Sequence, residues 1–171
     1  PEYPEERINY IQKDSNCKVV IDEGVVELFK KVLQQFESKN DSKSKSLTSL
    51  LCCVYTSGST GMPKGVNISN QNILNRIYWM WNKYPFKPNE RTCVKANIGF
   101  VDHIWEVFGG LLAGVTSIVV CQEKVNNIEQ FVETLQDNQV TRLVLIPSLL
   151  RLILEIEGFT EKLANIYYWT C

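Results

Sequence analysis

The sequence contains almost no histidine, and its cysteines lack the spacing of a metal site. Its 171 residues include one histidine and six cysteines, none of them in a C-x-x-C pair. Structural zinc sites need four Cys or His ligands at short spacing, so we expect no protein metal site. Several cysteines lie in apolar runs, which is typical of reduced thiols in a cytoplasmic protein.

An excess of charge and long apolar runs are also absent. The chain has 18 basic and 19 acidic residues, a net charge of -1, which predicts neither a nucleic-acid nor a membrane partner. The uncharged, largely apolar stretch from Val107 to Gln122 is too short and too rich in glycine to span a bilayer. No signal or transit peptide opens the sequence. Because residue 1 is proline and not methionine, we expect further residues before it.

Short β-branched runs alternate along the chain with longer stretches of helical periodicity. The strand-like runs are Lys18–Ile21, Leu50–Tyr55, Thr92–Ala96, Thr116–Cys121, Arg142–Ile146 and Ile166–Trp169. The helix-like runs are Glu5–Lys13, Val25–Glu37, Gln71–Lys83, Ile104–Leu112, Ile128–Asn138 and Ser148–Glu157. This alternation predicts an α/β fold of parallel βαβ units, and no domain boundary interrupts it. The polar segment from Glu37 to Ser49 predicts a surface loop.

The stretch VYTSGSTGMPKG, residues 54 to 65, differs from the rest of the chain because few of its side chains can fill a core. Its glycines allow tight turns, and its hydroxyl groups and lysine are suited to binding an anion. The residues concerned are Thr56, Ser57, Gly58, Ser59, Thr60, Gly61, Lys64 and Gly65. At the end of a strand, this content predicts a phosphate-binding loop, although the spacing is not that of a Walker A motif. The alternative is a flexible surface turn, against which Pro63 weighs.

Three segments together resemble one family. YTSGSTGMPKG resembles the signature of the adenylate-forming (AMP-binding) superfamily, which includes acyl-CoA synthetases, luciferases and the adenylation domains of nonribosomal peptide synthetases. PEYPEERINYIQKDSNCKVVI, from residue 1 to 21, is similar to a segment of the peptide synthetase branch. FVDHIWEVFGGLLAG, from residue 100 to 114, resembles a third segment of that branch. The resemblance therefore covers nearly the whole chain.

The resemblance implies a fold, two cofactors and a set of ATP-binding residues. The fold is part of the large N-terminal subdomain of an adenylate-forming enzyme. Thr56, Ser57, Gly58, Ser59, Thr60 and Gly61 would bind the phosphates of ATP, with Lys64 as the catalytic cation and Mg²⁺ sharing the charge. The family's ribose-binding aspartate and C-terminal catalytic lysine do not occur in the sequence. We therefore expect residues 1–171 to be a partial adenylation domain that is inactive alone, with a phosphopantetheine carrier domain elsewhere in the same chain.

The resemblance also implies the substrate. Aligned on Trp105 and Glu106, enzymes for α-amino acids carry an aspartate at the position of Val101, whereas the acid here is Asp102. An ammonium group out of water needs a counter-charge, and a displaced acid suits a β-amino acid. Val101, Asp102, Trp105 and Val144 resemble the start of pockets for β-alanine, with Trp105 closing a short pocket. We therefore expect adenylation of an amino acid, β-alanine, for transfer to a carrier thiol or an amine.

Several alternatives stay open at the level of the sequence. Asp102 is also suited to cap the following helix, and the aromatic ring of Phe100 either lines the acyl channel or packs in the core. We expect an orienting role for Glu106 and a structural role for His103. The chain as a whole could instead belong to an acyl- or aryl-CoA ligase, in which a buried Asp102 would be unfavourable. A non-catalytic domain that retains the fold is the third possibility.

Overall fold

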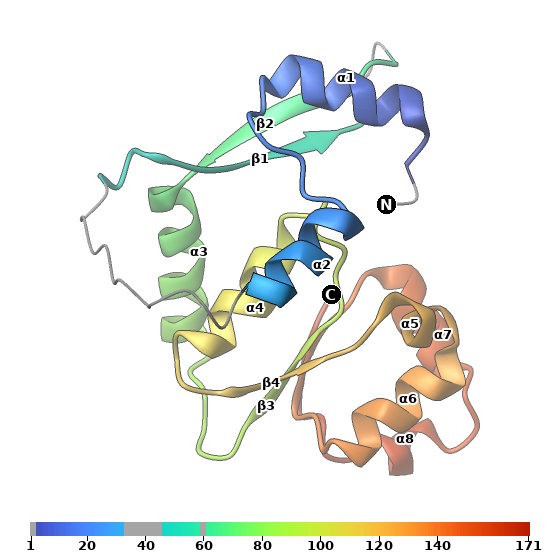
Figure 1. Cartoon of the computed structure of the whole chain (residues 1–171). Coiled ribbons are helices and arrows are strands. Elements are labelled where there is room, and N and C mark those ends of the chain that lie inside the picture. Colours follow the sequence, from blue (N-terminus) through green and yellow to red (C-terminus); the bar gives the residue numbers. More distant parts are fainter. Residues whose placement is uncertain (1–2, 33–45, 59–60) are drawn as a thin grey trace. The chain divides into compact units, whose positions relative to one another are not determined.

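The computed structural model describes residues 3–32, 46–58 and 61–171. They form two compact units, Pro1–Asn70 and Gln71–Cys171, and Figure 1 labels most of their elements. The helix predicted from Val25 to Glu37 and the loop predicted from Glu37 to Ser49 lie in part outside the described residues.

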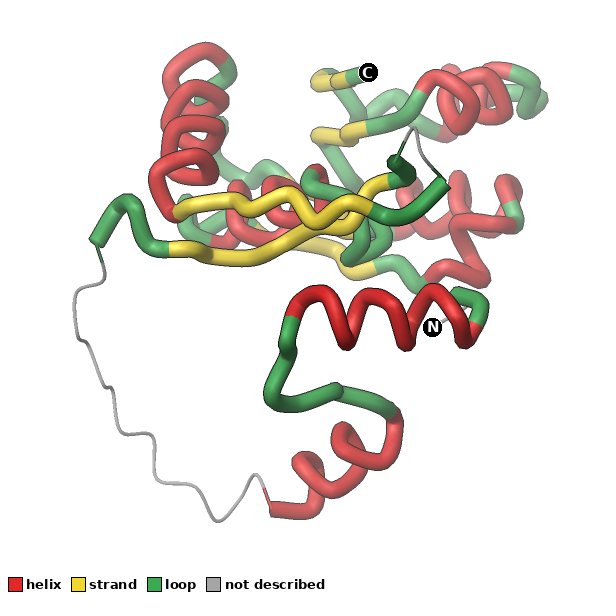
Figure 2. Tube along the Cα trace, turned by 90° about the horizontal axis from the view of Figure 1, so that it is seen from above, coloured by secondary structure: helices red, strands yellow, loops and turns green. Residues whose placement is uncertain are grey.

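The described residues of the first unit form two helices and an antiparallel β-hairpin, shown from above in Figure 2. Its elements are α1 (Glu5–Ser15), α2 (Glu23–Val32), β1 (Leu50–Thr56) and β2 (Lys64–Ser69). In the hairpin, Tyr55 is opposite Gly65 and Thr56 is opposite Lys64. The expectation of parallel units is wrong for this part of the chain, because β2 follows the loop directly and turns back along β1. A single loop of a few residues joins antiparallel strands but not parallel ones.

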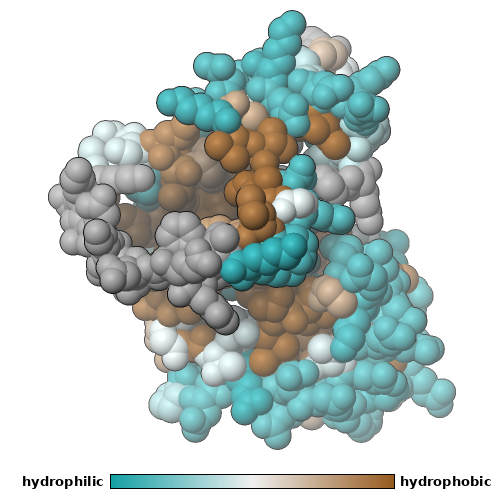
Figure 3. Space-filling view, in the orientation of Figure 1, coloured by the Kyte–Doolittle hydropathy of each residue, from teal (hydrophilic) through white to brown (hydrophobic). Residues whose placement is uncertain are grey.

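The strand predicted from Lys18 to Ile21 is also wrong. These residues connect α1 and α2 and pair with no described strand. Val19 and Ile21 are 70% and 74% exposed, so their β-branched side chains do not pack on a sheet in this unit. β-propensity reflects how well side chains pack on the pleated surface of a sheet. Without a neighbouring strand to pair with, a segment of high β-propensity does not form a strand. Hydrophobic surface is visible on this unit in Figure 3, and the exposed side chains of α2 contribute to it.

The second unit has the predicted α/β architecture. Its helices are α3 (Asn70–Lys83, which starts at the last residue of the first unit), α4 (Asp102–Leu111), α5 (Gln122–Asn126), α6 (Ile128–Asp137), α7 (Pro147–Leu154) and α8 (Phe159–Lys162). Its strands are β3 (Arg91–Val94), β4 (Thr116–Val119), β5 (Arg142–Val144) and β6 (Tyr168–Thr170). The strands form one parallel sheet in the order β4-β3-β5-β6. The predicted strands from Thr92, Thr116, Arg142 and Ile166 are therefore confirmed.

The core of the second unit lies between the sheet and α6. Phe131, Val132 and Leu135 of α6 are at most 1% exposed, and they pack with the buried Leu143 of β5 and Ile153 of α7. Their spacing puts the apolar side chains on one face of α6. At its start, the Asn127 side chain accepts a hydrogen bond from the backbone N–H of Gln130. In the described parts of the chain, no helix is long and apolar enough to cross a membrane.

Candidate functional site: a glycine loop and a small cavity

The glycine-rich loop joins the two strands of the hairpin in the first unit. Thr56 ends β1 and is opposite Lys64, which starts β2, so both lie at the mouth of the loop. Inside the loop, the N–H of Gly61 donates to the carbonyl of Gly58 at 3.0 Å. Ser57, Gly58 and Gly61 are described, whereas Ser59 and Thr60 lie outside the described residues. The hairpin therefore brings the described loop residues and Lys64 together.

Glycine is required at Gly58 by close contacts. A Cβ atom there would clash with the carbonyl oxygen of Met62 and lie 3.2 Å from Cγ of Lys64. Gly61 has a φ of 82°, a left-handed conformation that other residues rarely adopt. The stem of Lys64 thus lies against Gly58, and its ammonium forms no ion pair with any carboxylate of the described residues. A glycine-rich turn beside a lysine that has no carboxylate partner among the described residues is suited to binding an anion such as phosphate.

A hydrogen bond that sequence reasoning missed ties β1 to α1 beside this loop. The hydroxyl of Tyr55 donates to Oδ2 of Asp14 at 2.7 Å. This bond to Asp14 is the main cause that raises the pKa of Tyr55 from 10.0 to about 12, because the bond needs the hydroxyl proton. The two residues belong to two of the three segments that resemble the family, but they are 41 positions apart and nothing in the sequence pairs them.

In the second unit, Glu106 attaches α4 to the end of β3. Its carboxylate, 1% exposed, accepts hydrogen bonds from the backbone N–H groups of Lys95 and Ala96 at 2.8 and 2.7 Å. The Lys95 ammonium donates to the other oxygen of the same carboxylate at 2.8 Å. Nearby, Nδ1–H of His103 donates to the carbonyl of Ala96 at 2.7 Å. These contacts are those expected of an orienting Glu106 and a structural His103.

Two of the four predicted pocket residues, Trp105 and Val144, line the same cavity. The cavity has a volume of about 10 Å³, roughly the space that one water molecule needs. Its other lining residues are Phe86, Thr92, Cys93, Glu106, Gly110 and Arg142. Burial raises the pKa of the Cys93 thiol from 9.0 to about 12, so this one lining group keeps its proton even at mildly alkaline pH. Trp105 itself is 5% exposed.

The other two predicted pocket residues lie at the exposed start of α4, outside the lining of this cavity. Val101 is the N-cap residue and Asp102 is the first helical residue, and the helix has no side-chain cap hydrogen bond. The N-cap alternative for Asp102 is therefore wrong, because Val101 occupies the cap position. The Asp102 carboxylate, 54% exposed, lies 3.9 Å from the guanidinium of Arg76. Phe100 is 66% exposed, so its core-packing alternative is also wrong.

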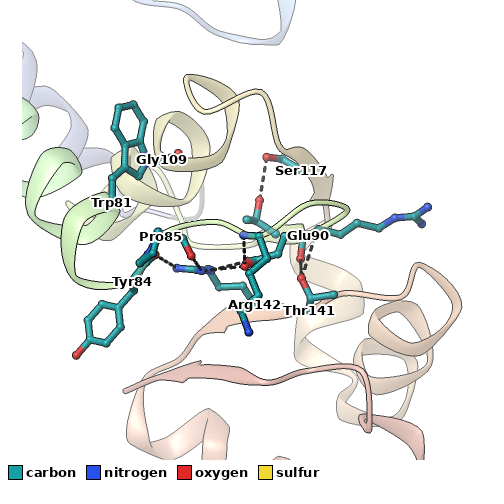
Figure 4. Close-up of polar contacts among 11 residues, drawn as sticks. Trp81, Tyr84, Pro85, Glu90, Gly109, Ser117, Thr141 and Arg142 are labelled. Carbon is teal, nitrogen blue, oxygen red and sulfur yellow. Dashed lines mark hydrogen bonds and ion pairs between the residues drawn. The ribbon is translucent and has the colours of Figure 1, made fainter.

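One of the lining residues, Arg142 of β5, forms a buried ion pair with Glu90 that the sequence did not predict (Figure 4). Nε of Arg142 donates to Glu90 at 2.8 Å, and the two side chains are 3% and 0% exposed. The sequence contained one signal of this pair: Arg142 starts the apolar run RLVLI, and a charged residue that is buried with such a run is almost always paired.

Among the described residues, no group of three His, Cys, Asp or Glu could hold a metal ion.

The chain belongs to the AMP-binding enzyme family, whose model matches residues 1–168. It is 34% identical over 195 residues to the Drosophila melanogaster β-alanyl-bioamine nonribosomal peptide synthetase ebony, covering 100% of this chain and 22% of the relative. The crystal structure of the nonribosomal peptide synthetase FmoA3 matches with a TM-score of 0.83 and 18% identity, covering 96% of this chain and 19% of that one.

A second solved structure identifies the part of the fold. The N-terminal subdomain of Klebsiella oxytoca NpsA, in complex with 3-hydroxyanthranilyl-AMSN, matches with a TM-score of 0.79 and 21% identity. The match covers 96% of this chain and 43% of that structure. The chain therefore has the fold of part of the N-terminal subdomain of adenylate-forming enzymes, as its sequence predicted. It spans about a fifth of the length of the Drosophila relative.

Proposed function

We propose that this chain supplies the ATP-phosphate loop and part of the amino-acid pocket of an enzyme that activates β-alanine as its acyl-adenylate. The observation that carries the proposal is the hairpin loop in which Gly58 and Lys64 are in contact and the lysine has no carboxylate partner among the described residues. Membership of the AMP-binding family supports it. Residues 1–171 would form part of the adenylation domain.

In the proposed reaction, a carboxylate oxygen of the amino acid attacks the α-phosphorus of ATP. A new P–O bond forms, and the bond to the β-phosphate oxygen breaks to release pyrophosphate. Negative charge grows on the leaving group, and fixed donors aimed at that charge lower the barrier. We assign the stabilisation of this charge to the loop and to the ammonium of Lys64. The loop residues are Thr56, Ser57, Gly58, Ser59, Thr60 and Gly61. We expect Mg²⁺ to accompany ATP, and we assign it no protein ligand.

The adenylate would then react with an acceptor nucleophile. The thiol of a phosphopantetheine group on a carrier domain, or an amine, attacks the acyl carbonyl and releases AMP. For the β-alanine assignment, the support is the set Val101, Asp102, Trp105 and Val144, together with the name of the Drosophila relative. In this assignment Asp102 faces the substrate ammonium and Trp105 limits the substrate's size.

Exchange of labelled pyrophosphate into ATP tests the phosphate loop in the full-length protein. Replacing Lys64 with alanine should slow amino-acid-dependent exchange by roughly 10²- to 10³-fold, the range for losing one charge-stabilising group. Lys31→Ala, on α2 of the same unit, removes an equal charge away from the loop and serves as the control. Equal exchange rates for Lys64→Ala and Lys31→Ala would refute the role of Lys64.

The same assay separates the proposed activity from a CoA ligase. Exchange that depends on fatty or aromatic acids, and not on any amino acid, would replace the amino-acid assignment with an acyl- or aryl-CoA ligase. If no carboxylic acid supports pyrophosphate exchange, the remaining interpretation is a non-catalytic domain that retains the fold.

A further inference from the structure

We infer that Phe86 and Arg142 set the size of the amino-acid pocket by fixing the position of Trp105. Neither residue is among the four pocket positions implied by the family resemblance, and both line the cavity that contains Trp105 and Val144. The inference rests on the proposed function, since it concerns the same pocket. The roles assigned are those of positioning residues, because both act through Trp105.

The first step is the contact between Phe86 and Trp105. Their rings are stacked, with centroids 6.3 Å apart and planes inclined by 9°. On its own helix, the Trp105 ring lies so close to Gly109 that a Cβ there would be 2.5 Å from the ring. The indole therefore has flat contacts with both Phe86 and the backbone of α4. Displacing Trp105 requires that one of these contacts be lost.

The second step is that Arg142 fixes Phe86 through both its ring and its backbone. The guanidinium carbon of Arg142 lies 4.3 Å from the centre of the Phe86 ring, within the range of a cation–π contact. Arg142 also donates to the carbonyls of Tyr84 and Pro85, the two residues before Phe86, at 2.8 and 3.1 Å (Figure 4).

Arg142 is itself held rigidly. Two of its N–H groups donate to the Glu90 carboxylate at 2.8 and 3.2 Å, and its guanidinium lies 4.1 Å from the ring centre of Tyr168 on β6. A guanidinium group is planar and pre-organised, so it loses little conformational entropy for each hydrogen bond that it forms. Because Arg142 starts β5 and Val144 ends it, one short strand carries both this anchor and the second pocket residue.

The third step is the size of the space that results. The cavity beside Trp105 has room for about one water molecule, which is too little space for the indole to move aside for an additional carbon group of the substrate. Protein interiors resist such displacement because their side chains are closely packed. A substrate with a branch at this wall is therefore rejected by the Phe86–Trp105 stack, and an unbranched one is not.

The test compares substrates that differ by one methyl group in the full-length protein. Pyrophosphate exchange is measured with β-alanine, 3-aminobutanoate and 3-amino-2-methylpropanoate, for the wild type and for Phe86→Ala. Without the Phe86 ring, Trp105 gains space to tilt. The preference for β-alanine over at least one methylated acid, as a ratio of kcat/KM, should fall by roughly tenfold or more. The KM for ATP should not change.

Matched variants exclude a general loss of stability. Phe159→Ala removes an aromatic ring that packs on the core of the same unit and is not part of the cavity lining. It should leave the preference unchanged. Phe86→Tyr keeps the flat ring and should also keep the preference, and Phe86→Leu replaces Phe86→Ala should the latter not fold.

Each outcome bears on one of the two proposals. An unchanged preference in Phe86→Ala, with β-alanine exchange still measurable, overturns the inference and leaves the proposed function in place. An equal loss of preference in Phe86→Tyr and Phe86→Ala also overturns it, because the flat ring would then be irrelevant. No exchange with any amino acid in the wild type overturns the proposed function, and the inference with it.

Discussion

Removing the buried Arg142 should destabilise the chain far more than breaking an exposed ion pair. In Arg142→Met, the apolar stem is kept, but the Glu90 carboxylate, 0% exposed, loses its counter-ion. The carbonyls of Tyr84 and Pro85 lose their donor as well. Breaking a buried pair by removing one partner costs about 3–5 kcal/mol. One hydrogen bond to Glu90 survives, from the N–H of Lys87, which favours the lower half of this range.

Urea unfolding of the chain, followed by circular dichroism, measures the loss. The control is Glu27→Gln in the first unit, whose partner Lys30 forms an ion pair with side chains 63% and 61% exposed. We expect this control to cost at most about 0.5 kcal/mol, as for exposed pairs on a helix. The double variant Glu90→Gln with Arg142→Met should be more stable than Arg142→Met, because no unpaired buried charge remains. A cost for Arg142→Met equal to that of the control would refute the reasoning.

Two further predictions concern Cys93 and Asp102. Burial raises the pKa of the Cys93 thiol from 9.0 to about 12, so between these values the unfolded thiol ionises and the folded one does not. Stability should therefore fall as the pH rises through this window, by at most about 1.4 kcal/mol per pH unit, and less steeply in Cys93→Ala; parallel pH profiles from urea unfolding would contradict this. Asp102→Ala should slow pyrophosphate exchange with β-alanine about fivefold, or about 1 kcal/mol, since the carboxylate is half-exposed. Exchange with propionate should not change, and equal losses on both acids would remove Asp102 from ammonium recognition.

The parallel sheet was predictable because β3, β4 and β5 are short apolar runs that are each followed by a helical run, and β6 is another short apolar run. The hairpin of the first unit was not. Its second strand, KGVNIS, has only two apolar residues in six and follows directly on the loop. This strand forms because it pairs with β1, and the local sequence pattern of β2 contains no information on that partner. For the opposite reason, the run from Lys18 to Ile21 has the composition of a strand but no partner among the described strands.

For the candidate site, too, local motifs were predictable and long-range contacts were not. The loop residues and Trp105 were predicted because whole motifs carry them. The structure places Trp105 and Val144 in one cavity, although no local signal in the sequence joins them. The ion pair beside this cavity could not be predicted from the sequence. Arg142 and Glu90 are 52 residues apart and come into contact only when the sheet forms. Arg142 was recognisable as unusual in an apolar strand, but neither its partner nor its contact with Phe86 was.

Charge has two different roles in the second unit, which bears on how the proposed enzyme would select its substrate. The pairs Glu106–Lys95 and Glu90–Arg142 are buried, with side chains at most 8% exposed, and each holds backbone on which the cavity depends. Asp102 and Arg76, in contrast, are about half-exposed and 3.9 Å apart. Salt screens exposed charges strongly and buried pairs much less. In the proposed enzyme, rejection of branched substrates would therefore rest on contacts that salt weakens little, whereas recognition of an ammonium group by Asp102 would rest on a charge that salt screens strongly.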